Sequence, residues 1–381
     1  MFVVSWSAND LLAQSKKIDP EKKAKWHTSK PGPPDLLGVS ISKPDKYFDG
    51  YTFFVSFLDE EAKLVDMHGK LVHVWKRETG AHWHFAEMLP NGHVLVVANE
   101  RGYSVKRSGD QRVFELDWNS NLVWESFVTG HHDATRMENG NTLVVCNGNA
   151  LYPELSEQPA LYDYLQEVNS KNEVVWEWHF TTHIEEIKKI VGDISPVKLL
   201  GDYPHINTIE SLPDNPLAAK DSRFKKGNIL LSARHISVVF IIDKESGEVV
   251  WAWGPGDIVG QHEPTMLANG NILIFDNGRG DQDIPDRSYS RVVEIDPVSY
   301  KTIWEYKTEI PENFVSYVGS GNQRLPNGNT LICAMNWKGG IGRIFEVTSE
   351  NEIVWEYWNP YQEKVYRAYR YPAELIEQFL E

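Results

Sequence analysis

Three histidines stand at the same place in three similar stretches of the chain. The stretches are "HFAEMLPNGHVLVVANE" from His84, "HDATRMENGNTLVVCNG" from His132 and "HEPTMLANGNILIFDNG" from His262, and each has its histidine eight residues before the turn glycine. An imidazole can act near neutral pH as a nucleophile, a proton donor or a metal ligand, because its ordinary pKa is about 6.5. Histidines in one register predict a shared site wherever the hairpins that carry them meet.

A tryptophan that follows an apolar pair recurs along the chain. The spacing is about fifty residues apart from one longer gap, which is typical of the blades of a propeller. The copies end at Trp75, Trp124, Trp176, Trp251, Trp304 and Trp355. The sequence therefore predicts an all-β fold, a six-bladed β-propeller with four antiparallel strands per blade. A sandwich or a lipocalin-like barrel does not predict a four-strand unit that recurs six times.

The repeat also predicts the domain boundaries. We expect a propeller over residues 36–360, an N-terminal arm over residues 1–35, and a C-terminal extension over residues 361–381 that contains a short helix. The long gap contains two insertions in the fourth unit, a partly helical one over residues 179–204 and one in the first hairpin over residues 213–227. Insertions in repeat proteins lie in loops, often on the binding face.

The first strand of each blade lines the central channel, so the starts of these strands share one mouth. In units two to six this position is occupied by His84, His132, His205, His262 and Ser320. The first unit offers no equivalent, and His82 is an alternative to His84. The second strands end at the same mouth with Asn99, Asn147, Arg234, Asp276 and Asn336. A single histidine at a strand end is usually structural, but four in register favour a functional site, because burying several imidazoles without function is unfavourable.

Arg234 is the one cation of the second set, in the stretch "LLSARHISVVF". It could form an ion pair with Asp276 or Glu263, or it could bind the oxygens of an anionic group through its planar guanidinium. The mouth has no pair of carboxylates such as a glycosidase needs. A Gly-rich phosphate loop of the form GxxxxGK[ST] is also missing from the sequence. The pattern favours group transfer from an anion without a nucleotide donor.

Composition limits the partners. The chain has 38 basic and 54 acidic residues and a formal charge of -16, which argues against nucleic-acid binding. Cys146 and Cys333 fall in the third and sixth units, too far apart for a disulfide. No apolar run is long enough to span a membrane, and the start "MFVVSWSANDLLAQ" lacks the pattern of a signal peptide. The compartment and the oligomeric state stay open.

Four stretches together resemble the arylsulfotransferase family of six-bladed propellers, which move a sulfuryl group between phenols without a nucleotide. They are "DYPHINTIESLP", "NILLSARHISVVFIID", "EVVWAWG" and "QHEPTMLANGNILIFDNG", and the resemblance spans roughly residues 35–357. It implies that His262 is the nucleophile, that His205 binds the donor and transfers a proton, that Arg234 binds oxygens and that His132 is a further channel histidine. Well-known members are exported and carry two cysteines close together in sequence, whereas Cys146 and Cys333 are distant.

The resemblance implies an aryl sulfate and a phenol as substrates and no cofactor. For the remaining mouth positions we expect substrate binding by His84, Asn147, Asp276 and Ser320. The aryl ring could stack on an aromatic side chain, for which the candidates are Trp83, Tyr203, Tyr317 and Trp337. Two alternatives remain. Three or four imidazoles could hold a transition metal for a lyase or an oxidoreductase, or the propeller could bind an anion or a partner protein without catalysis.

Overall fold

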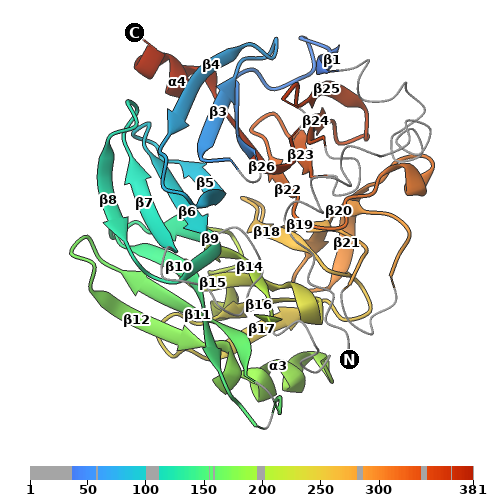
Figure 1. Ribbon diagram of the computed structural model, residues 1–381. Coiled ribbons are helices and arrows are strands. Elements are labelled where there is room, and N and C mark those ends of the chain that lie inside the picture. Colours follow the sequence, from blue (N-terminus) through green and yellow to red (C-terminus); the bar gives the residue numbers. More distant parts are fainter. Residues whose placement is uncertain are drawn as a thin grey trace, which may run out of the picture.

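The chain is arranged as a ring of six small antiparallel sheets, which confirms the predicted six-bladed β-propeller (Figure 1). The computed structural model describes residues 37–56, 59–99, 111–153, 155–157, 159–194, 202–280, 286–335, 341–361 and 363–380. The predicted arm over residues 1–35 lies outside these ranges. The first strands of neighbouring blades contact one another around the centre of the ring. The starts of these strands are thereby brought together.

Blades 2 to 5 are each built from four strands that are consecutive in the chain and pair in that order. Blade 2 contains β5 (His82–Met88), β6 (Val94–Asn99), β7 (Arg112–Leu116) and β8 (Leu122–Ser126), and blade 3 contains β9 (Gly130–Arg136), β10 (Thr142–Ala150), β11 (Ala160–Val168) and β12 (Val174–His179). Blade 4 contains β14 (Ile206–Ser211), β15 (Ile229–Ala233), β16 (Val238–Ile242) and β17 (Val249–Trp253), and blade 5 contains β18 (His262–Met266), β19 (Ile272–Asp276), β20 (Arg291–Asp296) and β21 (Lys301–Tyr306). The short β13 (Asp202–Tyr203) pairs with β11.

The two ends of the described chain close the ring. Blade 6 contains β22 (Gly321–Arg324), β23 (Thr330–Ala334), β24 (Arg343–Val347) and β25 (Ile353–Trp358), and β1 (Gly38–Ser42) adds a fifth strand outside β25. Blade 1 contains β2 (Tyr51–Ser56), β3 (Glu61–Val65) and β4 (Leu71–Lys76), and its first strand is the C-terminal β26 (Val365–Tyr371). The predicted boundary at residue 360 is therefore wrong, because β26 belongs to the propeller and only α4 (Ala373–Leu380) lies beyond the sheets.

The repeated tryptophans lie on equivalent fourth strands, as predicted, and Trp251, Trp304 and Trp355 each join their blade to the next. The indole Nε1 of Trp251 in blade 4 donates to the carbonyl of Pro297 in blade 5, at 2.9 Å. Trp355 in blade 6 donates in the same way to Met67 in blade 1, also at 2.9 Å. Both rings are fully buried. A large ring with one polar atom can fill the space between sheets and form a hydrogen bond to the next blade, although Nε1 of Trp75 and Nε1 of Trp124 have no hydrogen-bond partner among the described residues.

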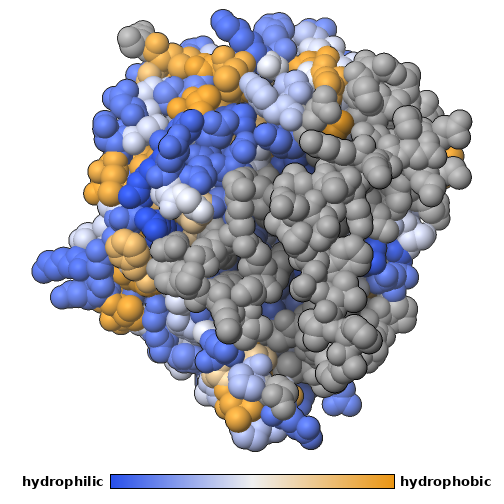
Figure 2. All heavy atoms as spheres, viewed as in Figure 1, coloured by the Kyte–Doolittle hydropathy of each residue, from blue (hydrophilic) through white to orange (hydrophobic). Residues whose placement is uncertain are grey.

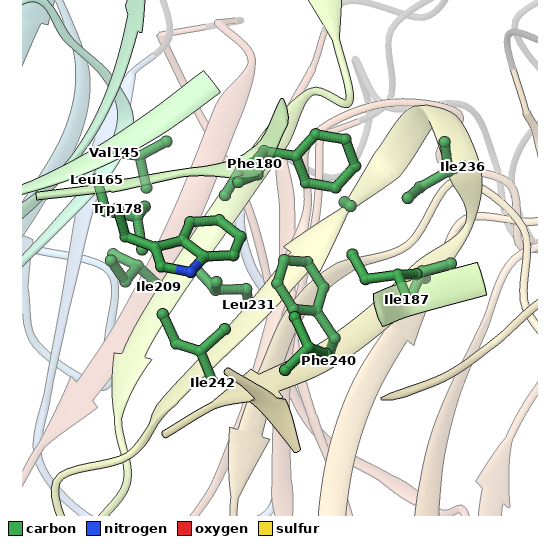
Figure 3. Packing of buried hydrophobic residues seen from close by; sticks show 14 of the residues in the cluster. Val145, Leu165, Trp178, Phe180, Ile187, Ile209, Leu231, Ile236, Phe240 and Ile242 are labelled. Carbon is green, nitrogen blue, oxygen red and sulfur yellow. The ribbon is translucent and has the colours of Figure 1, made fainter. Parts of the chain in front are cut away.

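Apolar side chains fill the spaces between neighbouring sheets. Figure 3 shows one such cluster, in which Trp178 and Phe180 from the end of blade 3 lie beside Leu231 and Phe240 of blade 4. The insertion predicted to be partly helical contains α3 (Ile184–Val191), which buries Ile187 in this cluster. Cys146 and Cys333 are buried and free, so the prediction of no disulfide is confirmed.

On the face shown in Figure 2, the described residues are mostly hydrophilic, with groups of apolar side chains among them. Several of the exposed apolar residues, among them Leu71, Leu122 and Val174, lie at the starts of the fourth strands, where each blade faces solvent. Within the described residues, neither α3 nor α4 is long and apolar enough to cross a membrane.

Candidate active site

Irregular pairing marks the starts of the first strands, where the predicted site residues lie. The register shifts beside His84 in β5, directly after His205 in β14 and after His262 in β18. His132 and His205 have left-handed backbones, with φ of 59° and 65°. A β-bulge re-aims a side chain, and a strained φ at a non-glycine residue is common at functional sites. The first side chains of these strands therefore do not follow the regular alternation of a pleated strand.

The structure brings three of the predicted histidines into direct contact. The ring of His132 lies 4.5 Å from that of His205 and 4.2 Å from that of His84, measured between centroids. All four channel histidines, including His262, are no more than 6 % exposed. The alternative His82 stands beside His84, with 6.0 Å between the ring centroids. His84 is the one that contacts His132.

Tyr366 completes the ring of side chains. It lies near the start of β26, at the first-strand position that sequence reasoning left empty in blade 1. Its ring centroid is 5.0 Å from that of His84 and 6.3 Å from those of His132 and His262. The sequence could have pointed to this residue, because the first unit lacks a first strand. A closed propeller can complete such a blade with a strand from the C-terminus.

His262 is held by a side chain that fixes its tautomer. Asn277, directly after β19, donates from Nδ2 to the carbonyls of Ser316 (2.6 Å) and Gly319 (3.1 Å). Its Oδ1 therefore faces Nδ1 of His262 at 2.8 Å and accepts a hydrogen from it. Burial, followed by the nearby charge of Arg234, lowers the pKa of His262 well below its ordinary value. The ring is neutral at neutral pH, with its lone pair on the distal nitrogen, Nε2.

His205 has a carboxylate behind it instead of an amide. Its Nδ1 lies 2.8 Å from Oδ2 of Asp202 and donates to it. Burial alone would raise the pKa of Asp202, but the charge and hydrogen bond of His205 hold it below its usual range. This hydrogen bond places a hydrogen on Nδ1 of His205 and leaves Nε2 as the other ring nitrogen. The two channel histidines thus differ in the group that accepts from Nδ1. This group is an amide oxygen at His262 and a carboxylate at His205.

His235, which is off the predicted register, supports His205. Its ring stacks on that of His205 with 4.4 Å between centroids. Its Nδ1 donates to the backbone carbonyl of Asp202 at 2.7 Å. Burial, then the charges of His205 and Arg234, lowers the pKa of His235 to about 3. His235 therefore stays neutral at neutral pH.

Arg234 lies at the turn after β15, 3 % exposed. Its backbone N–H donates to the carbonyl of His205 at 3.0 Å. Its Nη2 donates to the carbonyl of Tyr317 at 3.3 Å. Its charge contributes to the lowered pKa of His262. A buried guanidinium is thereby placed next to the neutral histidine.

The predicted ion-pair alternatives for Arg234 have other partners. Asp276 is fully buried and contacts Arg287 at 2.6 Å and Arg291 at 2.9 Å. Its carboxylate also accepts hydrogen bonds from the backbone N–H groups of Val259 and Gly278. These partners belong to blade 5 and its loops. The prediction that Asp276 binds substrate is not supported by these contacts. Glu263 interacts with Arg367 and Tyr369 of β26.

The other two predicted mouth residues are buried; Asn147 lies within β10, which continues to Ala150 beyond the strand end predicted from the sequence, and Ser320 lies directly before β22. Asn147 is 2 % exposed and lies opposite Asp163 in the register of β10 and β11. Ser320 is fully buried, and its Oγ lies 2.7 Å from Oγ of Ser316. Ser320 therefore braces the loop that accepts hydrogen bonds from Asn277.

Two of the aromatic candidates for ring stacking lie elsewhere. Trp83 is fully buried and packs edge-on against Phe114 in blade 2. Tyr203 packs against Phe180 in the core between blades 3 and 4. These contacts place both rings in the apolar packing between sheets, so they do not support stacking of an aryl group on Trp83 or Tyr203. Asn336 and Trp337 lie outside the described residues.

A layer of acidic side chains follows the histidines along the first strands, which sequence reasoning missed. Arg367 of β26 donates to Asp133 at 2.8 Å and lies 3.8 Å from Glu263. Burial raises the pKa of Glu87 and of Glu210 to about 8, and neighbouring carboxylates add to both shifts. Burial also raises the pKa of Glu263 to about 7, against the influence of Arg367. A buried guanidinium and several weakly acidic groups thus underlie the ring of histidines.

A metal site receives no support from the described part of the chain. Among those residues, no group of three or more His, Cys, Asp or Glu side chains is arranged to hold a metal ion. The histidines instead use Nδ1 for hydrogen bonds to their own supports.

Comparisons with known proteins show a family match and a similar fold. The family model described as "Arylsulfotransferase (ASST)" matches residues 86–360. No curated protein matches the chain. A solved protein of unknown function from Bacteroides caccae is similar with 13 % identity and a TM-score of 0.54, over 84 % of this chain and 98 % of that one. A streptogramin B lyase structure is similar with 12 % identity and a TM-score of 0.47, over 87 % of this chain and 85 % of that one. At such identities the likeness to solved structures concerns the fold alone.

Proposed function

Because the chain belongs to the arylsulfotransferase family, we propose that it moves a sulfuryl group from an aryl sulfate ester to a phenol through a sulfo-histidine at His262. The observation that carries this proposal is the environment of His262. The ring is buried, its Nδ1 is engaged by Asn277, and the charge of Arg234 is close. A neutral imidazole with its lone pair at Nε2 is the form that can attack sulfur.

In the donor half-reaction, Nε2 of His262 forms a bond to sulfur while the bond from sulfur to the phenolic oxygen breaks. The electron pair of that bond goes to the oxygen, which takes a proton from Nε2 of His205. Asp202 holds the ring of His205 through Nδ1, which leaves Nε2 for this transfer. In the acceptor half-reaction a phenol returns its proton to His205 and attacks the sulfur, and His262 is released.

Arg234 is the group we assign to the sulfuryl oxygens. A guanidinium contacts two oxygens at once, and a positive group held in place stabilises charge that develops during transfer. His132, between the rings of His84 and His205, adds a further polar contact. His84 and Tyr366 face each other edge-on at 5.0 Å and provide aromatic surface for the aryl group. Asn147 remains a proposed contact at the mouth.

The test of the proposal is steady-state transfer from a chromogenic aryl sulfate to an added phenol. A ping-pong reaction predicts that release of the chromogenic phenol depends on the acceptor and that double-reciprocal plots give parallel lines. Dialysis against a chelator should leave the rate unchanged. A rate that vanishes with chelator and returns with metal would establish the metal-dependent alternative, and binding of aryl sulfate without turnover would establish the non-catalytic one.

A further inference from the structure

One buried arginine contacts the residues that follow the channel histidines in four blades. Arg367 comes directly after Tyr366 in β26 and is 4 % exposed. Its guanidinium contacts residues that stand one to three places after a histidine of the channel. These are Phe85 after His84, Asp133 after His132, Asn207 and Thr208 after His205, and Glu263 after His262. A single side chain of blade 1 thus reaches the first strands of blades 2, 3, 4 and 5.

The contacts of Arg367 use the shape of a guanidinium. Its Nη1 donates to Oδ2 of Asp133 at 2.8 Å. Its Nη2 donates to the carbonyl of Asn207 at 2.6 Å and to Oγ1 of Thr208 at 2.8 Å. The guanidinium carbon lies 5.3 Å from the centre of the Phe85 ring. Two nitrogens held apart in one plane can serve acceptors on β9 and β14 together, which the single nitrogen of a lysine cannot do.

Glu263 extends these contacts to blade 6. Its Oε2 lies 3.8 Å from Nε of Arg367 and accepts from the backbone N–H of Asn322 in β22 at 3.0 Å. Only glycine leaves room for this carboxyl group, because a Cβ on Gly321 would lie 1.6 Å from Oε2 of Glu263. The backbone N–H of Glu263 donates in turn to Oγ1 of Thr208 at 3.0 Å. All six first strands are therefore linked to one guanidinium, directly or through one residue.

We propose that Arg367 is a positioning residue for sulfuryl transfer, because it sets the distances between the channel histidines. His132, His205 and Glu263 have left-handed backbones, with φ of 59°, 65° and 47°. Such strain persists only where the surrounding structure holds it, and Arg367 contacts Glu263 itself and residues one or two places after the two histidines. The role rests on the proposed function, in which a nucleophile and an acid must face one sulfur, and a misplacement of about 1 Å can lower a rate about 10²-fold.

Arg367→Lys tests the proposal, and Arg370→Lys is the matched control. Both arginines are buried on β26, but Arg370 donates to Oγ1 of Thr52 and to the carbonyl of Phe48. Both substitutions leave buried acceptors unsatisfied, so both should lower the free energy of unfolding. Only Arg367→Lys should lower kcat for transfer from an aryl sulfate, by about 10²-fold. The change in KM should be much smaller, because Arg234 still binds the anionic group.

Proton NMR of the histidine rings tests the spacing without any reaction. Each imidazole ring shifts the ring-proton signals of its neighbours, and the centroids of His132 and His205 are only 4.5 Å apart. We expect the ring signals of these two histidines to move in Arg367→Lys and to stay in place in Arg370→Lys. Ring signals that stay in place in both variants would overturn the inference.

Thr208→Val is a second, milder variant, which decides the question if Arg367→Lys does not fold. It keeps the shape of the side chain but removes the oxygen that accepts from Arg367 and from the backbone of Glu263, so the same signals should move and kcat should fall by less. If the signals move but the unaltered protein transfers no sulfuryl group, the proposed function fails and the control of ring spacing stands. If transfer occurs and Arg367→Lys loses no more kcat than Arg370→Lys, this inference alone fails.

Discussion

A histidine nucleophile needs a neutral ring with a free distal nitrogen, and at His262 this condition is set by one neighbour. Asn277 presents its Oδ1 to His262 and can only accept a hydrogen bond from it. Its amide hydrogens are directed to two backbone carbonyls. The sequence register predicted His262, His205, Arg234 and His132. Each lies at a strand end, and the repeat shows where the corresponding strand ends fall in the other units. It did not predict Asn277 or Asp202, because side-chain supports depend on which loops meet, and no repeat period marks them.

Arg234→Lys is expected to lower kcat/KM about 10²–10³-fold although the positive charge remains. An ammonium is a point charge and lacks the planar fork that contacts two oxygens. Arg234 is buried, and its Nη2 already donates to the carbonyl of Tyr317, so the shorter reach of a lysine donor cannot satisfy both partners. Steady-state rates for a chromogenic aryl sulfate measure the effect. Near-normal activity would show that Arg234 acts only as a structural cation.

Elements determine the direction of these side chains. The starts of β5, β9, β14 and β18 are bulged at or beside the histidines, and His132 and His205 adopt left-handed φ values. The strands themselves were predictable from apolar alternation and Asn-Gly turns. The bulges were not, because they depend on local pairing rather than on composition.

The C-terminal strand is the clearest case in which sequence reasoning failed. The repeat is marked by the tryptophan of the fourth strand, and β26 comes after the last of these tryptophans and is followed by α4 instead of a hairpin. It pairs with β2 instead, more than three hundred residues earlier in the chain. This strand supplies Tyr366 to the ring of histidines and Arg367 to the acidic layer. A strand assigned to an outer extension thus contributes to the centre.

At the scale of the whole molecule, the acidic layer draws side chains from several blades and makes stability depend on pH. Glu87 has its pKa raised from 4.5 to about 8, by burial first and by neighbouring carboxylates second. Between these values the unfolded chain loses the proton while the folded protein keeps it. The stabilising contribution is complete below pH 4.5 and is lost as pH rises through about 8.

Glu87→Gln is therefore expected to make the fall in the free energy of unfolding between pH 5 and pH 8 shallower, since an amide does not titrate in this range. Chemical denaturation at a series of pH values measures the slope. Glu167→Gln is the control, because hydrogen bonds with Lys244 and two asparagines overcome burial and lower the pKa of Glu167, so its titration falls below this range. An unchanged slope in Glu87→Gln would contradict the assigned burial of that carboxyl group.

The central claim is that the sulfuryl group is carried by His262. The direct measurement mixes the protein with an aryl sulfate and no acceptor, then records released phenol and the mass of the peptide that contains His262. The account predicts a burst of about one equivalent of phenol per site and one added sulfuryl group on His262. In His262→Ala both the burst and the adduct should be absent. A burst that persists in His262→Ala, or an adduct on another residue, would contradict the account.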